Sequence, residues 1–84
     1  MEDKGTIYLE ILSPERTLKK GQVDCVFLPG SAGAFEVLWN HAPLVSSLSG
    51  GEIRWRLDGK EGVLKISSGF VEVFENKVVA CVEE

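Results

Sequence analysis

The chain has 84 residues, of which 44% are hydrophobic and 26% charged, and nine Lys and Arg against thirteen Asp and Glu give a net charge of −4. This length and composition are typical of one small globular domain, here residues 1–84, and the acidic balance argues against nucleic-acid binding despite a local pair, Arg54 and Arg56. No apolar stretch approaches the length of a membrane span, and the N-terminus lacks the apolar core of a signal peptide, so we expect an intracellular protein without a direct membrane span.

The first half of the chain reads as short strands separated by turns. Residues 6–12, TIYLEIL, alternate apolar and polar side chains, which predicts a half-buried strand ending before Pro14. A very short strand is expected within residues 16–21 and a continuous one over residues 22–28, which Pro29 and Gly30 end. Residues 36–39 and 44–48 add two further strands, with a turn between them.

The last third of the chain has the clearest pattern. Residues 52–57 alternate Ile53, Trp55 and Leu57 on one face with Glu52, Arg54 and Arg56 on the other, which we interpret as a solvated face. Asp58 with Gly59, and Glu75 with Asn76, are expected to turn two consecutive hairpins. Because no window has a helical period, the chain is predicted to be all-β, a two-layer antiparallel β-sandwich of roughly ten short strands.

The residues that could carry chemistry do not form a recognisable catalytic or metal motif. His41, the single histidine, could belong to a catalytic site, a metal site or a turn. No nucleophile motif surrounds it, and two Cys and one His at unrelated spacings provide too few zinc ligands. Cys25 and Cys81 are expected to be reduced, buried thiols rather than a disulfide. We therefore expect no enzyme activity and no cofactor, and a turn or contact role for His41.

Residues 13–54 followed by residues 66–84 resemble the epsilon subunit of bacterial F-type ATP synthases, the counterpart of the mitochondrial delta subunit. The resemblance runs nearly end to end, and the order and spacing of its pieces make it specific. It rests on Pro14 and Glu15, Val23, Leu28 to Gly30, Asn40 to Leu44, Ser67, Gly69 to Val73, and Asn76.

The resemblance implies a non-catalytic rotor subunit. In this family the N-terminal β-sandwich sits at the foot of the central stalk, packs on the gamma subunit and rests on the polar loops of the membrane c-ring. It joins the two, so that proton or sodium flow is coupled to ATP synthesis on other subunits. The implied location is peripheral, on the cytoplasmic face of the bacterial cell membrane.

Carried over by position, the resemblance implies two sets of contact residues. The set that faces gamma is Ser13, Val45, Ser46, Ser47 and Ser67. The set that faces the c-ring is Ser31, Ala32, Gly33, Ala34, Glu36 and His41. Residues 31–43 are expected to form one rim, with a turn at Asn40 that leaves Trp39 partly buried and His41 at that rim.

The chain departs from the family pattern in two respects. Family members usually carry acidic residues near positions 32 and 34, where this chain has alanine, and the acidic contact is expected to have moved to Glu36. They commonly add a C-terminal helical hairpin, whereas this sequence stops at Glu84, so no ATP binding is expected. The alternative interpretation is a free-standing β-sandwich or barrel that binds a small ligand or peptide at its edge, where a barrel would need an enclosed apolar pocket.

Overall fold

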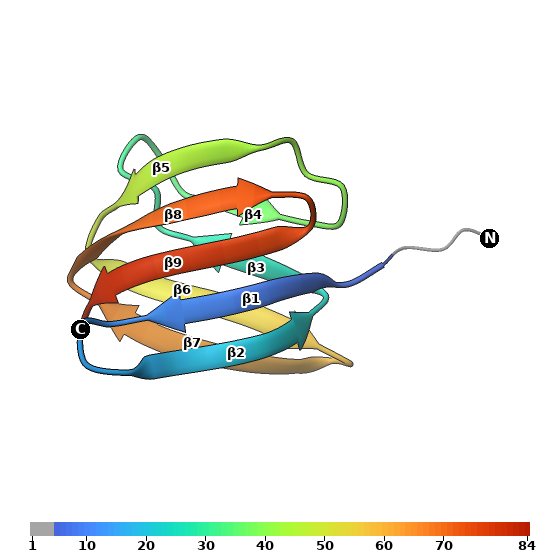
Figure 1. Ribbon diagram of the computed structural model, residues 1–84, viewed down its shortest axis with the longest axis horizontal. Coiled ribbons are helices and arrows are strands. Elements are labelled where there is room, and N and C mark those ends of the chain that lie inside the picture. The colour runs from blue at the N-terminus through green and yellow to red at the C-terminus, as the bar shows by residue number, and fades with distance from the viewer. Residues whose placement is uncertain (1–4) are drawn as a thin grey trace.

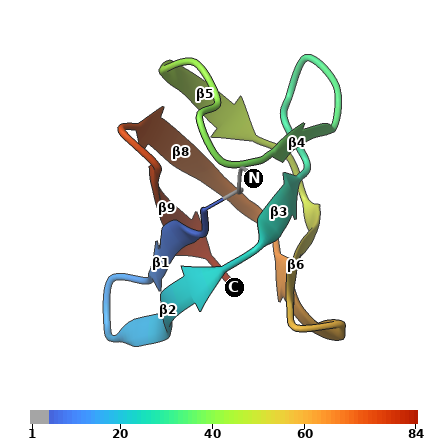
Figure 2. The same cartoon turned by 90° about the vertical axis from the view of Figure 1, so that its right-hand side faces the viewer.

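The computed structural model describes residues 5–84, which form nine strands and no helix. The strands are β1 (Ile7–Leu12), β2 (Thr17–Val23), β3 (Cys25–Leu28), β4 (Phe35–Val37), β5 (Leu44–Leu48), β6 (Gly51–Leu57), β7 (Lys60–Ile66), β8 (Ser68–Phe74) and β9 (Lys77–Glu83). They make a five-stranded sheet, in the order β2-β1-β9-β8-β5, and a four-stranded sheet, in the order β4-β3-β6-β7. The two sheets form the layers seen in Figures 1 and 2, which confirms the predicted all-β sandwich.

Neighbouring strands are antiparallel except for β1 and β9, which pair in parallel. The two predicted hairpins, β6–β7 and β8–β9, are confirmed. Their two-residue turns have positive φ angles at both positions: 52° and 78° at Asp58 and Gly59, and 49° and 61° at Glu75 and Asn76. Positive φ at both positions is the type I′ geometry, which matches the twist of the strands that it joins.

The segment around Asp24 differs from the sequence prediction. The expected continuous strand over residues 22–28 is divided, because β2 ends at Val23 in one sheet and β3 begins at Cys25 in the other. The expected very short strand before Gly21 is instead the seven-residue β2. The crossing is stabilised where the Asp24 carboxylate accepts a hydrogen bond from the backbone N–H of Asp58 at 3.0 Å.

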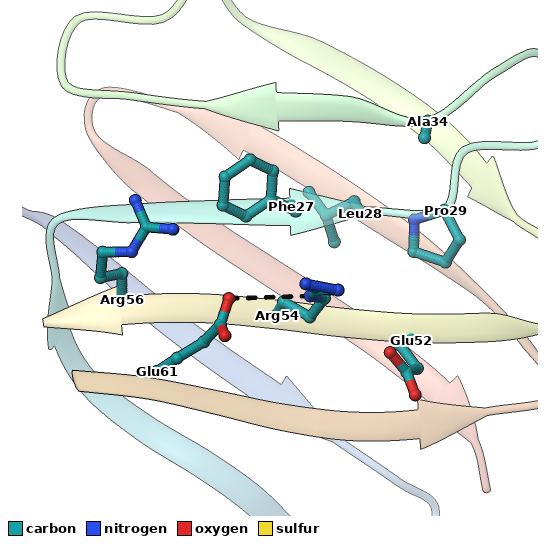
Figure 3. Close-up of a pocket in the computed structure, with 8 residues that line it drawn as sticks. All are labelled: Phe27, Leu28, Pro29, Ala34, Glu52, Arg54, Arg56 and Glu61. Atoms are coloured by element: carbon teal, nitrogen blue, oxygen red, sulfur yellow. Dashed lines mark ion pairs between the residues drawn. The ribbon is translucent and has the colours of Figure 1, made fainter. Parts of the chain in front are cut away.

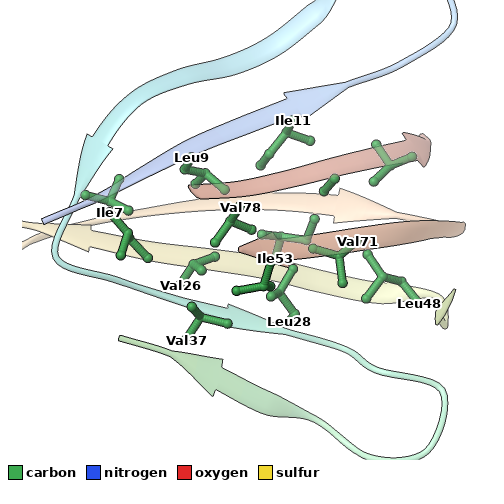
Figure 4. Close-up of a cluster of buried hydrophobic side chains, with 14 of the residues drawn as sticks. Ile7, Leu9, Ile11, Val26, Leu28, Val37, Leu48, Ile53, Val71 and Val78 are labelled. Carbon is green, nitrogen blue, oxygen red and sulfur yellow. The ribbon is translucent and has the colours of Figure 1, made fainter. Parts of the chain in front are cut away.

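The core is a layer of aliphatic side chains between the sheets, shown in Figure 4. Its members follow the two-residue period of the strands, since the side chains that alternate with them point outward. They are Ile7, Leu9, Ile11, Val23, Val26, Leu28, Val37, Leu48, Ile53, Ile66, Val71, Val73, Val78, Ala80 and Val82. Side chains fill the space between the sheets, so the hollows described below lie on the surface of the sandwich.

Trp55 of β6 lies against Gly62 of β7, its cross-strand partner. A Cβ atom on Gly62 would overlap the indole ring, so glycine is what allows the ring to lie across the strand. The ammonium of Lys19, which extends from β2 of the opposite sheet, lies 5.3 Å from the centre of the same ring. Trp55 is therefore partly buried and packs against the core between β2 and β7.

Replacing Gly62 with valine is expected to lower the free energy of unfolding by about 1–3 kcal/mol, because the new side chain must displace the Trp55 ring. Urea denaturation followed by tryptophan fluorescence measures the loss. The matched control is Val63→Ile, one residue along the same strand, where the side chain is exposed. Equal stability of both variants and the unmodified chain would contradict the packing described.

Candidate functional site

The outer side of the five-stranded sheet carries a continuous apolar surface, here called the apolar face: Leu12, Val45, Ser47, Phe70, Val79 and Cys81. One row crosses four strands, because Ser47 pairs with Phe70, Phe70 with Cys81, and Cys81 with Leu12. The two large side chains at its centre are open to solvent, with Val45 73% and Phe70 64% exposed.

The apolar face is hollowed toward the end of the sandwich where β1 ends. A groove of about 670 Å³ is lined there by Leu12, Ser13, Pro14, Ser47, Leu48, Ser68, Gly69, Phe70, Cys81, Val82 and Glu83. In the next row Glu72 lies between Val45 and Val79, within the apolar face, while Glu83 lies at the groove and Lys77 lies beyond Val79 at the other end of β9. A clustered apolar surface with a polar border is typical of a protein interaction site.

The structure brings together most of the residues that the resemblance assigns to gamma. Val45 and Ser47 lie on the apolar face, and Ser13 lines its groove. Ser67 lies at the same end, where its backbone N–H and hydroxyl both donate to the Glu83 carbonyl, at 2.8 and 3.2 Å. Ser46 points the other way, since it alternates with Val45 and Ser47 and shares the inner side of β5 with the core.

The six residues assigned to the c-ring do not form one surface. Residues 31–34 lie beside the C-terminal end of β5, where the Ser31 N–H donates to the Ser47 carbonyl at 3.0 Å and the Ser47 hydroxyl donates to Ser31 Oγ at 2.9 Å. Glu36 lies on β4, paired with Phe27 of β3. His41 precedes the N-terminal end of β5, so the expected single rim over residues 31–43 is wrong: Figure 1 shows its two loops at opposite ends of β5.

The turn at Asn40 is confirmed and separates Trp39 from His41. Asn40 has a φ of 66°, and its N–H donates to the side-chain carbonyl of Asn76 at 2.6 Å. This turn interrupts the alternation that begins at buried Val37, which leaves Trp39 41% exposed. The His41 N–H donates to the Leu38 carbonyl at 3.1 Å, so His41 is a turn residue as expected.

The two cysteines are both free, but only one is buried. Burial raises the pKa of the Cys25 thiol, and the nearby Glu36 carboxylate adds to the effect. The pKa of Cys25 is therefore higher in the folded chain than in the unfolded one. The protonated thiol contributes to the free energy of unfolding below about pH 9, and this contribution is lost as the pH rises and the thiol ionises. Cys81 lies exposed on the apolar face, so the prediction that both thiols are buried is wrong for Cys81.

The outer side of the four-stranded sheet is different in character, as Figure 3 shows. A hollow of about 430 Å³ has Phe27, Leu28, Pro29 and Ala34 on one side and Glu52, Arg54, Arg56 and Glu61 on the other. Arg54 Nε lies 3.7 Å from a Glu61 carboxylate oxygen, and the Arg56 guanidinium lies 5.8 Å from the centre of the Phe27 ring. The charges of β6 are exposed, which confirms the predicted solvated face.

Residues 5–84 contain neither a metal-binding cluster nor a membrane-spanning helix. No group of three or more His, Cys, Asp and Glu side chains there could hold a metal ion. In the same part of the chain, no helix is long and apolar enough to cross a membrane.

Sequence reasoning missed two residues of the apolar face, Phe70 and Cys81. The β8 sequence did contain a signal, because Phe70 and Phe74 share a face with Glu72 while Val71 and Val73 take the other. A glutamate between two phenylalanines indicates that the aromatic rings point away from the core. For β9 the signal is weaker: Lys77 and Glu83 share a face with Val79 and Cys81, which indicates the outer side, but the middle of that face is as apolar as the other face.

Ellman's reagent is expected to react rapidly with one thiol per folded chain. Cys81 is exposed, whereas Cys25 is buried and its raised pKa keeps it protonated near neutral pH. The Cys81→Ser variant should lose the fast phase entirely, and unfolding in urea should release the second thiol. A fast phase that survives Cys81→Ser would contradict the assignment.

An all-β sandwich with one broad, exposed apolar sheet surface belongs to the class of small interaction domains. The chain belongs to a family of such domains, because the family model described as "ATP synthase, Delta/Epsilon chain, beta-sandwich domain" matches residues 6–84.

Relatives agree with this membership. The chain is 46% identical over 74 residues to the ATP synthase epsilon chain of Desulfitobacterium hafniense, covering 88% of this chain and 56% of that one. It is 44% identical over 79 residues to the epsilon chain of Carboxydothermus hydrogenoformans, covering 94% and 58%. The chain thus spans a little over half the length of these curated relatives.

Solved structures share the fold. A chain in the mitochondrial ATP synthase of Euglena gracilis, solved with OSCP, F1 and the c-ring, superposes with a TM-score of 0.88 at 21% identity, covering all of this chain and 59% of that chain. A chain in the central stalk and c-ring of the Tetrahymena thermophila mitochondrial ATP synthase gives a TM-score of 0.79 at 12% identity, with coverage of 99% and 67%.

Proposed function

We propose that the chain is the β-sandwich part of a non-catalytic rotor subunit of an F1Fo ATP synthase. It joins the gamma subunit to the membrane c-ring, and so couples ion flow to ATP synthesis on other subunits. The single observation that carries the proposal is the apolar face in a chain of the delta/epsilon family. As part of that complex, the chain is peripheral to the membrane, on the cytoplasmic face in a bacterium.

The apolar face is the surface that meets gamma. Exposed Val45 and Phe70 are the side chains that a partner must cover to gain hydrophobic stabilisation, at roughly 25 cal/mol per Å² buried. Ser13 and Ser47 line the adjoining groove, where small side chains leave room for a bulky group of the partner.

The loop of residues 31–34 is the part that meets the c-ring. It lies beside the C-terminal end of β5, at an end of the sandwich in Figure 1, whereas the apolar face is formed by outward side chains of the five-stranded sheet. Two surfaces at an angle allow one small domain to hold two partners at once. Glu36 lies on β4, and His41 lies at the opposite end of β5 from this loop. The proposed ring contact therefore does not include His41, although the resemblance had assigned it to that contact.

Val45→Asp is expected to weaken association with the gamma subunit by tenfold or more, because a buried, unpaired carboxylate opposes the contact. The matched control is Val63→Asp, the same change at an exposed valine on the opposite sheet, which should leave binding within about twofold. Co-purification and titration calorimetry with the gamma subunit of the same organism measure both.

Added salt should reduce the affinity much less than Val45→Asp does, because salt screens charges and leaves apolar packing in place. Equal losses for Val45→Asp and Val63→Asp would place the gamma contact on another surface. A stable, soluble chain that binds a small molecule and ignores gamma would favour the free-standing binding module.

A further inference from the structure

The outer edge of β7 is a free strand edge seven residues long, at the end of the four-stranded sheet. The side-chain periodicity and the β6–β7 turn together determine which backbone groups face outward. In a type I′ turn the Lys60 N–H bonds to the Leu57 carbonyl, so Leu57 and Lys60 form a hydrogen-bonded pair. Hydrogen-bonded and non-hydrogen-bonded pairs then alternate along the ladder.

This alternation leaves three residues of β7 with backbone N–H and C=O groups pointing away from β6. They are Glu61, Val63 and Lys65, which pair without hydrogen bonds to Arg56, Arg54 and Glu52. Their side chains lie on the outer side of the sheet and are all exposed, Val63 to 51%. The edge therefore presents three evenly spaced pairs of backbone N–H and C=O groups. The residues that carry them have, in chain order, an acidic, an apolar and a basic side chain.

The other edges are less open. Residue Ser31 already donates to the outward carbonyl of Ser47 on β5, and β4 is only three residues long. β2 carries adjacent Lys19 and Lys20 and no acidic residue, which is a typical protection against edge pairing. β7 also carries two lysines, but Lys60 adjoins the β6–β7 turn and Lys65 is offset by Glu61 on the same face, so the middle of its edge lacks this protection.

We propose that β7 pairs antiparallel with β7 of a second copy of this chain, about a two-fold axis at Val63. Around that axis Val63 faces its own copy, and Glu61 of each chain faces Lys65 of the other. All three pairs are of the hydrogen-bonded type, because all three residues direct their backbone groups outward. The two four-stranded sheets become one continuous eight-stranded sheet, a contact by strand addition.

Charge complementarity indicates that the strand paired with the edge of β7 is β7 of a second copy. Opposite charges directly across an antiparallel pair are stabilising, whereas like charges there are destabilising. The order acidic, apolar, basic along β7 is complementary to itself only when reversed, which is the arrangement that a two-fold axis imposes. The pairing uses the edge of the four-stranded sheet, so it leaves the apolar face of the other sheet uncovered and is independent of the proposed gamma contact.

Sedimentation equilibrium of the chain tests the pairing. The weight-average mass should rise from 9.2 kDa toward twice that value between about 10 µM and about 1 mM, as expected of a small, polar interface. E61K alone and K65E alone should each remain monomeric, because each places like charges opposite one another. The double variant E61K/K65E should associate again, and so should an equimolar mixture of the two single variants.

Two further variants separate this edge from the rest of the molecule. Val63→Pro removes an outward N–H and no hydrogen bond of the domain's own ladder, so it should keep the strand circular dichroism and lose the dimer. Glu52→Lys, on the same face but on an inner strand, should dimerise like the unmodified chain. A monomer at 1 mM, or single charge variants that dimerise unchanged, would overturn the proposal, as would a mixture that fails to associate.

Discussion

The parallel pairing of β1 with β9 is the contact on which the rest of the structure depends. β1 is the only strand that joins β2 to the β9-β8-β5 part of the five-stranded sheet. It also contributes Ile7, Leu9 and Ile11, all fully buried, to the core. Because the pair joins the two ends of the chain, nearly the whole chain must close into a loop before these side chains are buried, and folding is expected to be slow for its size.

The same pairing builds the proposed binding surface. It places Leu12 beside Cys81, which extends the apolar face from β5 across to β1. The two outer surfaces of the sandwich have different properties: that of the five-stranded sheet exposes a cluster of apolar side chains, and that of the four-stranded sheet exposes the charges of β6. Such a division suits a domain that docks by one broad side and remains in contact with solvent on the other.

The sequence predicted the parts of this structure that depend on local chemistry. The alternation around Ile53 and the Asp58 turn predicted a hairpin correctly, because strand periodicity and positive φ are properties of short segments. The crossing at Asp24 could not be predicted, since the apolar pattern continues through it while the strand changes sheets. Cys81 was not predicted to be exposed because the middle of β9 is apolar on both faces, with Lys77 and Glu83 only at the ends of the outer one. The separation of His41 from residues 31–34 likewise depends on where β5 lies.

If gamma covers the apolar face in the assembled rotor, as proposed, the rate of thiol labelling at Cys81 should fall when the complex forms. The account predicts that Cys81 reacts rapidly in the free chain and at least tenfold more slowly in the complex with gamma, because the partner excludes the reagent. A cysteine placed by Glu52→Cys in a Cys81→Ser background, on the outer side of the four-stranded sheet, should keep its reactivity in the same complex. Unchanged labelling of Cys81 in a complex shown to contain both subunits would contradict the account.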